Sequence, residues 1–466
     1  MLSLTFFGAS NTVTGAKFLL GAGNDRILVE CGLFQGLKEL RQRNWDGLPF
    51  SPAELSAVVL THAHIDHTGY LPRLVLNGFK GPVYATAPTV DLCGILLPDA
   101  GELQEEEAAH ANEHGYSKHS PALPLYTAAD AVACLRYFVR LTYGRRRKIT
   151  PDVWLRLVDA GHILGSSIAE VWLDDGVNKR KVVFSGDLGR YGGPILNDPT
   201  SIPKGDFVVV EATYGDREHS PHPPEQELAE AINKVMDTSS VLLIPAFSVG
   251  RTQRILYEIH KLESNGVIPK LPVYVDSPMA IDATNIFLSY PEAHRLEFRK
   301  KENADGDHPL ACSRLEFVRS PKESAQLDRL DGPAIIISAS GMATGGRILN
   351  HLAAYLPDPR AIVLFVGFQA EGTRGRALVE GSPEVKIQGQ MVPVRAQIKL
   401  IEGFSAHGDV NDLLRWLREF KRPPIKVFLV HGETSALNAL ARRVERELGY
   451  ATHIPAYGER VALDGK

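Results

Sequence analysis

The chain has 466 residues, of which 44% are hydrophobic and 23% charged, and its formal net charge is −4 at pH 7. This length allows two or three domains with large cores, and the charge argues against a protein that coats nucleic acid through bulk electrostatics. No apolar run reaches membrane-spanning length, and the N-terminus lacks the features of a secretory signal. We therefore expect a cytoplasmic protein that does not contact membranes and whose four cysteines are buried thiols.

The opening segment is predicted to be rich in β-strands. Short apolar runs alternate with glycine-bearing turns between residues 2 and 30, which is the pattern of an antiparallel meander. A further apolar run at residues 57–60 leads directly into the sequence Thr-His-Ala-His-Ile-Asp-His at residues 61–67.

This histidine-rich turn has the composition of a metal site. Its three imidazoles and one carboxylate are the nitrogen and oxygen donors that zinc prefers. Alternate side chains of an extended segment point the same way, so His62 and His64 can share one ion. Asp66 and His67 lie past the bend and can reach a second ion. The spacing therefore predicts two metal ions.

Strands and helices then alternate up to residue 141. His110 and His114 fall one helical turn apart, but they lack the strand and carboxylate that accompany the first site, so we interpret them as surface side chains. The basic run at residues 145–148 has two interpretations, a solvated face or a supplement to phosphate binding. Apolar spacing predicts a strand at 83–85 and helices at 71–76, 89–97, 102–112 and 128–141.

Three later apolar strands each stop at a candidate ligand with a glycine nearby. A strand that ends in this way places its last side chain at a sheet edge, where the backbone can approach a bound ion. The recurrence of the pattern favours a functional role over isolated turn residues. The runs 154–158, 181–184 and 207–210 lead to His162, Asp187 and Glu211 respectively.

Regular alternation of strands and helices between about 224 and 389 predicts a parallel α/β domain. The ligand-bearing pattern resumes afterwards, where the run 398–401 leads to His407 and the run 427–430 leads to His431. We therefore expect the α/β domain to interrupt the first one. The predicted segments are 1–212 and 390–466 for the first domain and 213–389 for the insert.

With these residues in view, the chain resembles the metallo-β-lactamase superfamily. Within it the resemblance is to the β-CASP nucleases, which include the endonuclease subunit of the cleavage and polyadenylation machinery and its prokaryotic homologues. The resemblance implies a metallo-β-lactamase αββα sandwich interrupted by an inserted parallel α/β β-CASP domain. As a separate expectation, this chain carries no appended RNA-binding domain. The motifs that carry it, in the family's order, are the HxHxDH turn, His162, Asp187, Glu211, His407 in Ser-Ala-His-Gly-Asp and His431 in Val-His-Gly-Glu.

One position departs from the family pattern. The family usually has aspartate at the end of an early strand, and this chain has Glu30. That carboxylate is not normally a direct ligand, so we expect Glu30 to orient the metal-binding turn from behind.

The resemblance implies two Zn2+ per chain and a full set of site residues. A hydroxide bridging the two ions would attack phosphorus in line, and Asp66 and Asp187 would serve both as ligands and as catalytic residues. His407 would be the general acid, with Glu211 holding its ring in the right tautomer. The implied ligands are His62, His64 and His162 on one zinc, Asp66, His67 and His431 on the other, and Asp187 on both.

The implied substrate is single-stranded RNA. Family members that process RNA resemble this chain in having a histidine at the position of His431, and a flexible strand enters a cleft between domains more easily than a duplex. Ser340 and Gly341 lie in a glycine-rich loop that could bind phosphate through backbone amides, and Arg251 and Arg374 are candidate phosphate contacts. We expect endonucleolytic cutting, with 5′-exonucleolytic action as an addition, in RNA processing or decay.

Three alternatives remain open. The first-domain ligands would also serve a small-molecule metallo-hydrolase that acts on a thioester, lactone or lactam. A DNA-acting repair nuclease of the same family and an inert protein that only binds RNA or partners are the others. The inserted domain and His407 count against the first alternative, and the complete ligand set counts against the last. The RNA sequence preference, the metal loaded in vivo and the oligomeric state, with a homodimer among the options, stay open.

Overall fold

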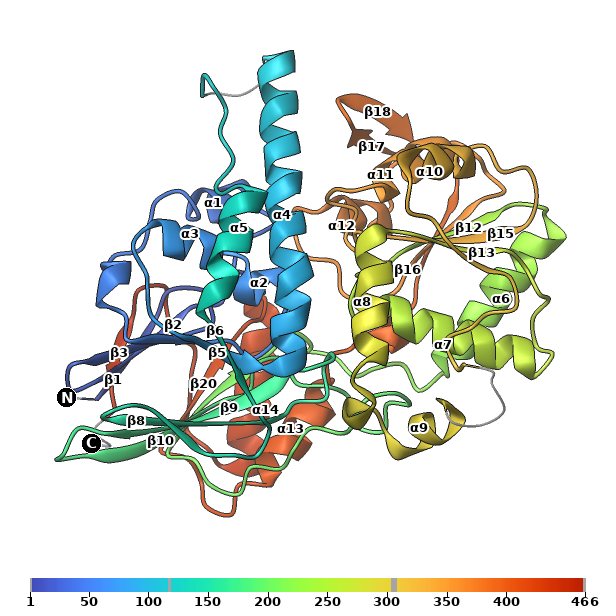
Figure 1. Cartoon of the computed structure of the whole chain (residues 1–466). Coiled ribbons are helices and arrows are strands. Elements are labelled where there is room, and N and C mark those ends of the chain that lie inside the picture. Colours follow the sequence, from blue (N-terminus) through green and yellow to red (C-terminus); the bar gives the residue numbers. More distant parts are fainter. Residues whose placement is uncertain (1, 116–118, 303–307, 464–466) are drawn as a thin grey trace. The chain divides into compact units, whose positions relative to one another are not determined.

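The computed structural model describes residues 2–115, 119–302 and 308–463. Met1 and Lys466, the outer ends of the predicted first domain, lie outside these ranges. The chain divides into two compact units (Figure 1). The first comprises Met1–Glu218 with His407–Lys466, and the second comprises His219–Ala406.

The first unit contains two seven-stranded sheets that enclose a common apolar core. One sheet has the spatial order β22 (Arg460–Ala462), β1 (Ser3–Phe6), β2 (Phe18–Ala22), β3 (Asp25–Val29), β4 (Ala57–Val59), β5 (Val83–Thr86) and β6 (Phe138–Leu141). The other has the order β21 (Thr452–His453), β20 (Lys426–Val430), β11 (Phe207–Glu211), β10 (Lys179–Phe184), β9 (Ser167–Asp174), β8 (Val153–Asp159) and β7 (Arg147–Thr150).

Helices cover the outer faces of this sandwich, with α3 to α5 on one side and α13 and α14 on the other (Figure 1). The burial of the strands follows from this layering. β11 is a continuous apolar run because the core lies on one face and helices on the other, whereas β8 alternates between buried and partly exposed residues. The helices are α1 (Lys38–Gln42), α2 (Ile65–Thr68), α3 (Leu71–Leu76), α4 (Ala87–His114), α5 (Ala128–Cys134), α13 (Val410–Arg418) and α14 (Thr434–Leu448).

The second unit has a six-stranded parallel sheet and a separate antiparallel hairpin of β17 (Glu384–Ile387) and β18 (Gln390–Pro393). The sheet order is β14 (Leu315–Phe317), β13 (Val273–Asp276), β15 (Ala334–Ser338), β12 (Val241–Pro245), β16 (Ile362–Phe365) and β19 (Gln397–Leu400). The helices are α6 (Pro224–Asp237), α7 (Arg251–Ser264), α8 (Pro278–Leu288), α9 (Leu296–Glu302), α10 (Pro321–Leu327), α11 (Ile348–Tyr355) and α12 (Arg374–Val379). The sandwich and the parallel sheet have the architecture that the sequence predicted.

Three predicted helices differ from the structure. The predicted helix 128–141 ends at Cys134, and Phe138–Leu141 forms β6 because it pairs with β5 at the edge of the first sheet. Its apolar spacing fits both a helix and a strand, and pairing with the edge of β5 decides between them. The predicted helices 89–97 and 102–112 are one helix, α4, which continues through Pro98.

The strand at 398–401 also differs from the prediction. It was expected to belong to the resumed first domain, but β19 pairs in parallel with β16 in the sheet of the second unit. We therefore propose that the insert ends after Ala406 rather than at residue 389, in agreement with the division into compact units.

The remaining general expectations concern cysteines and membranes. All four cysteines are buried and free, as expected. Within the described ranges, no helix has the length and apolar character needed to cross a bilayer.

Candidate metal centre

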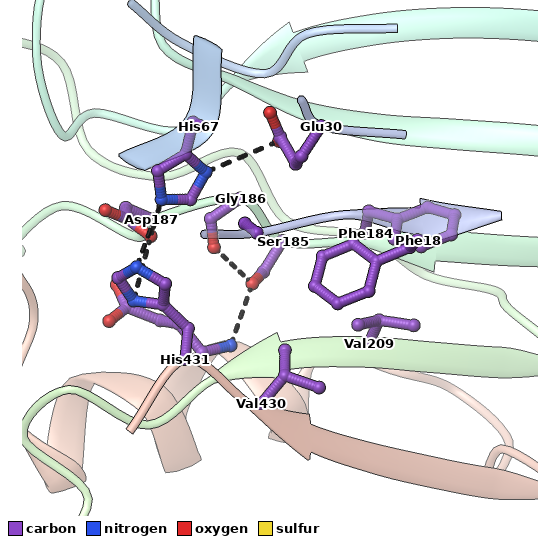
Figure 2. Close-up of a pocket in the computed structure, with 12 residues that line it drawn as sticks. Phe18, Glu30, His67, Phe184, Ser185, Gly186, Asp187, Val209, Val430 and His431 are labelled. Carbon is purple, nitrogen blue, oxygen red and sulfur yellow. Dashed lines mark hydrogen bonds and ion pairs between the residues drawn. The ribbon is translucent and has the colours of Figure 1, made fainter. Parts of the chain in front are cut away.

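The candidate ligands lie in segments that follow strands of both sheets of the first unit. β4 leads to His62 and His64, and the next turn, α2, carries Asp66 and His67. The remaining three candidates follow β8, β10 and β20, and they are His162, Asp187 and His431. The segments that follow these strands of the two sheets therefore meet at one place. Figure 2 shows this place around His67, Asp187 and His431.

Three imidazoles converge in a first donor group. His64 Nδ1 lies 3.1 Å from His62 Nε2 and 3.4 Å from His162 Nε2. Asp187 Oδ2 completes the group, at 3.4 Å from His62 Nε2 and 3.6 Å from His162 Nε2. All four donor atoms lie within 4.8 Å of one another.

A second donor group lies on the other side of Asp187. His67 Nε2 and His431 Nε2 are 3.1 Å apart, and Asp66 Oδ2 lies 3.4 Å from His431 Nε2. Asp187 Oδ1 lies 3.4 Å from His67 Nε2 and 3.5 Å from His431 Nδ1. The two oxygens of Asp187 therefore face different groups, which is the arrangement of a bridging carboxylate.

These distances fit a metal ion in each group. Ligand atoms about 2.0–2.1 Å from a tetrahedral zinc are separated from one another by about 3.3 Å. The shortest donor separations, between 3.1 and 3.6 Å, bracket that value. Among the described residues, Asp187 Oδ1 is buried and has no hydrogen-bond partner. A buried acceptor without a donor is unfavourable, and a cation would satisfy it.

Two threonine hydroxyls contact the Nδ1 atoms of candidate ligand histidines. Thr61 Oγ1 lies 3.0 Å from His62 Nδ1, and Thr213 Oγ1 lies 3.2 Å from His431 Nδ1. Such contacts hold the orientation of the ring and leave Nε2 as the nitrogen that can bind a metal ion. Sequence reasoning missed both threonines, although Thr61 is adjacent to His62 and Thr213 is two residues after Glu211.

Burial favours the neutral form of the three imidazoles in the first donor group. It lowers the pKa of His64 to about 4 and the pKa values of His62 and His162 well below the ordinary value. Neutral imidazole is the form that binds metal. His67 is the exception, because the carboxylates of Asp187, Asp66 and Glu30 together outweigh burial and raise its pKa to about 10.

Two glycines allow the backbone to approach the turn. A Cβ on Gly32 would lie 1.5 Å from the main-chain oxygen of Asp66. Gly186, next to Asp187, has a φ of +54°, and a Cβ there would lie 2.6 Å from Thr61 Oγ1. A side chain at either position would therefore displace the segment that carries the donors.

Glu30 lies behind the turn, as its departure from the family pattern suggested. Its carboxylate oxygens accept the main-chain amide of Thr61 at 3.3 and 3.4 Å. Its Oε1 lies 3.7 Å from His67 Nδ1, on the side of the ring away from the second donor group (Figure 2). Glu30 is only 1% exposed, so water cannot easily replace these contacts.

Replacing Glu30 with alanine is expected to weaken metal binding about 10- to 100-fold, since residues behind the ligands contribute on this scale. Thr61 would lose its acceptor and His67 its neighbouring carboxylate. Competition against a chromogenic chelator measures the affinity. Glu30→Gln is the matched control, because it keeps an acceptor oxygen for Thr61 but removes the charge. An unchanged affinity in Glu30→Ala would contradict the supporting role.

His407 and Glu211 form a pair beside the first donor group. His407 Nδ1 lies 3.2 and 3.1 Å from the two carboxylate oxygens of Glu211. The buried Glu211 is itself held, because Oε1 accepts the amide of Leu188 at 2.6 Å and Oε2 accepts the amide of Thr213 at 3.3 Å. The His407 ring lies 4.4 Å from the ring of His162. The pairing predicted from the sequence is therefore present in space.

The backbone around His407 is also fixed. The amide of Gly408 donates to the carbonyl of Leu188 at 2.8 Å. Asp409 caps α13 and accepts the amides of Asn411 and Asp412. The residues that follow His407 are thus anchored, next to the loop that carries Asp187.

The candidate substrate residues lie in the second unit. Ser340 and Gly341 occupy the loop between β15 and α11, where Ser340 Oγ accepts the amide of Thr344 at 3.1 Å. Arg374 is half-buried and donates to the carbonyls of Ala343 and Lys386. It supports the same loop, and its role with substrate stays a prediction.

The position of Arg251 differs from the prediction, which was an exposed side chain that contacts phosphate. It is 7% exposed, and its guanidinium donates to the carbonyls of Val366 and Phe404. Arg251 begins α7, and both acceptor carbonyls belong to its own unit. We therefore assign it a structural role.

The chain matches three family descriptions in the order expected for this architecture. Residues 17–101 match the Metallo-beta-lactamase superfamily and residues 252–378 match the Beta-Casp domain. Residues 391–455 match a Zn-dependent metallo-hydrolase RNA specificity domain.

Relatives match along nearly the whole chain. Ribonuclease TTHA0252 of Thermus thermophilus is 38% identical over 98% of this chain and 99% of its own length. Transcription termination factor FttA of Methanocaldococcus jannaschii is 32% identical over 97% of this chain and 70% of its own length. The crystal structure of a protein of unknown function from Enterococcus faecalis V583 shares the fold, with 14% identity, a TM-score of 0.52 and 99% of both chains covered.

The fold and the convergent donors define a metal-dependent hydrolase. More specifically, the chain belongs to the β-CASP family of the metallo-β-lactamase superfamily. The resemblance stated from the sequence is confirmed.

Proposed function

We propose that this protein is a metal-dependent ribonuclease that hydrolyses phosphodiester bonds of single-stranded RNA during RNA processing or decay. The observation that carries the proposal is the position of Asp187, with one oxygen toward each donor group and the His407–Glu211 pair beside it. The names of the two relatives, a ribonuclease and a transcription termination factor, support RNA as the substrate.

The donor set supports two zinc ions. Imidazole nitrogens and carboxylate oxygens with tetrahedral spacing suit zinc, and zinc bound at both groups would acidify water and neutralise charge on phosphoryl oxygens. We assign His62, His64 and His162 to one ion, Asp66, His67 and His431 to the other, and Asp187 to both.

His407 and Glu211 have separate tasks in this proposal. Hydrolysis leaves an alkoxide that needs a proton, and His407 is placed to donate it from Nε2, because Nδ1 faces Glu211. The Glu211 carboxylate fixes the tautomer and stabilises the protonated ring. The two main-chain amides that bind Glu211 keep it in place through this proton transfer.

The proposal is tested by incubating zinc-loaded protein with one end-labelled single-stranded RNA and its DNA counterpart, with a chelator-treated control. We expect cutting of RNA that the chelator abolishes and zinc restores. Preferential cutting of DNA would instead indicate a repair nuclease. Cutting of neither strand, with metal bound, would indicate a small-molecule ester substrate.

We further propose that cutting is endonucleolytic, with 5′-exonucleolytic trimming as an additional mode. The resemblance to the β-CASP nucleases supports this division. Circular RNA separates the two modes because it has no end. Linearisation of the circle requires an internal cut, and an intact circle in a reaction that degrades linear RNA would contradict the endonucleolytic proposal.

A further inference from the structure

A row of aromatic and basic side chains crosses four strands of the second sheet of the first unit. Lys148 on β7 is paired with Trp154 on β8, Trp154 with Trp172 on β9, and Trp172 with Lys181 on β10. Cross-strand partners point to the same face of a sheet. The alternate residues Val153, Leu155, Val171 and Val182 belong to the core, so this row lies on the outer face.

Cations lie over both indole rings of this row. The guanidinium carbon of Arg146 lies 4.3 Å from the ring centroid of Trp172 and 5.4 Å from that of Trp154. Lys148 Nζ lies 4.9 Å from the Trp154 centroid, and Lys181 Nζ lies 5.0 Å from the Trp172 centroid. The indoles thus hold the cations in fixed positions.

The helices that cover the second sheet leave this row in contact with solvent. α13 and α14 pack on the other part of the sheet, through residues such as Val183, Val208 and Leu429. Trp154 and Trp172 remain half-buried, and Arg146 and Lys148 are exposed. We call the set of Arg146, Lys148, Trp154, Trp172 and Lys181 the tryptophan face.

Positive charge on the tryptophan face exceeds negative charge. Its inner carboxylate is Glu170, which is fully buried and pairs with Arg156 and Lys181. Counting only the residues that the structure describes, none of the four side chains of the basic run 145–148 forms an ion pair with a carboxylate. The whole chain carries a net charge of −4, so this local surplus is not a consequence of composition.

We propose that the tryptophan face binds the phosphate backbone of the single-stranded RNA substrate outside the metal centre. The clustered cations match the charge of phosphates, and the exposed guanidinium plane of Arg146 offers a surface on which a base can stack. A polyanion also relieves the repulsion between the clustered cations.

The position of the face suits a strand that also occupies the metal centre. β8 runs from Val153, beside the face, to Asp159, and the chain then reaches His162. Seven extended residues span about 20 Å, so a strand a few nucleotides longer than the cut site would reach the face. This inference rests on the proposed ribonuclease function and adds a preference for long substrates.

Binding of labelled RNAs of about 3 and about 30 nucleotides to the full-length protein tests the inference, because about 3 nucleotides are too short to occupy the metal centre and the face together. Arg146→Glu combined with Lys148→Glu is expected to raise the Kd for the long RNA about tenfold or more and to leave the short RNA unaffected. Lys421→Glu combined with Arg422→Glu is the matched control, because it makes the same charge change at exposed positions of the same unit. The control pair is expected to change neither Kd appreciably.

A salt titration provides a second readout that does not depend on charge reversal. Arg146→Ala combined with Lys148→Ala is expected to reduce the slope of log Kd against log salt by about 1.4, since each single-strand phosphate contact contributes about 0.7. Thermal unfolding checks that the variants stay folded. Trp172→Phe keeps an aromatic ring in the sheet but reduces the ring face that Arg146 contacts, and we expect it to weaken binding of the long RNA only.

The outcomes separate the two proposals. If the unchanged protein cuts RNA and the tryptophan-face variants bind the long RNA as the control pair does, the tryptophan face is not a binding site and the ribonuclease function stands. If the unchanged protein neither binds nor cuts RNA, both proposals are overturned. If the tryptophan-face variants bound the short and the long RNA equally more weakly, this result would also contradict a contact outside the metal centre.

Discussion

Asp187→Asn is expected to reduce RNA cleavage on the order of 10³-fold or more and to lower the amount of bound metal. Asparagine has the same shape, but it replaces one of the two anionic oxygens with a hydrogen-bond donor. That donor would face either the His62 or the His67 side of the centre, where the oxygens of Asp187 lie 3.4 Å from imidazole nitrogens. Metal content by elemental analysis and initial cleavage rates measure the two effects.

Asp130→Asn is the control for this experiment. It makes the same exchange at a carboxylate that caps α5 in the same unit, where the side chain accepts the amide of Thr127. We expect full metal content and full activity in this variant. Asp187→Asn with undiminished metal and activity would show that Asp187 does not bridge the two donor groups.

His407→Ala is expected to keep its metal and to lose about 10²- to 10⁴-fold in the rate of RNA cleavage. The general acid contributes only where the leaving oxygen is strongly basic. A phosphodiester with a good leaving group, such as a nitrophenolate, departs without a proton, so we expect its hydrolysis to be far less affected. Glu211→Gln is expected to lose less cleavage activity than His407→Ala, because the His407 ring remains and only its carboxylate partner changes.

His453→Ala is the matched control, since His453 also pairs with a carboxylate, Glu459, at 2.6 Å and lies outside the centre. Its cleavage rate should equal that of the unchanged protein. Loss of metal in His407→Ala would identify His407 as a ligand instead. An equal deficit on both kinds of substrate would remove the acid role.

Much of the candidate centre could be predicted because its signals are local. The spacing of His62, His64, Asp66 and His67 is visible within one turn, and each remaining candidate ligand follows an apolar run. Strand ends gather at sheet edges, so the recurrence pointed to one place before any coordinates were known. The roles of these residues as ligands stay predictions until metal is measured.

Other features could not be predicted from the sequence because they depend on contacts between residues that are far apart in the chain. Thr213 and His431 are far apart in the chain, and nothing near either one indicates that a hydroxyl meets a ring nitrogen. The tryptophan face needs the register of β7 to β10, which places Trp154 opposite Trp172. The burial of Arg251 likewise follows from the packing of strand ends around it.

The sequence by itself determined the family, the two-layered β sandwich with its parallel insert, and which residue types are available to bind metal. The parallel insert and the available ligands follow from periodicity and short-range spacing, whereas the family and its sandwich are what the resemblance of the ordered motifs implies. Only the tertiary structure decided that the oxygens of Asp187 face different donor groups, that Glu30 stands behind the turn, and that β19 belongs to the second unit. Those properties depend on how distant segments pair and which side chains they bury, and the free energy of the whole fold selects them.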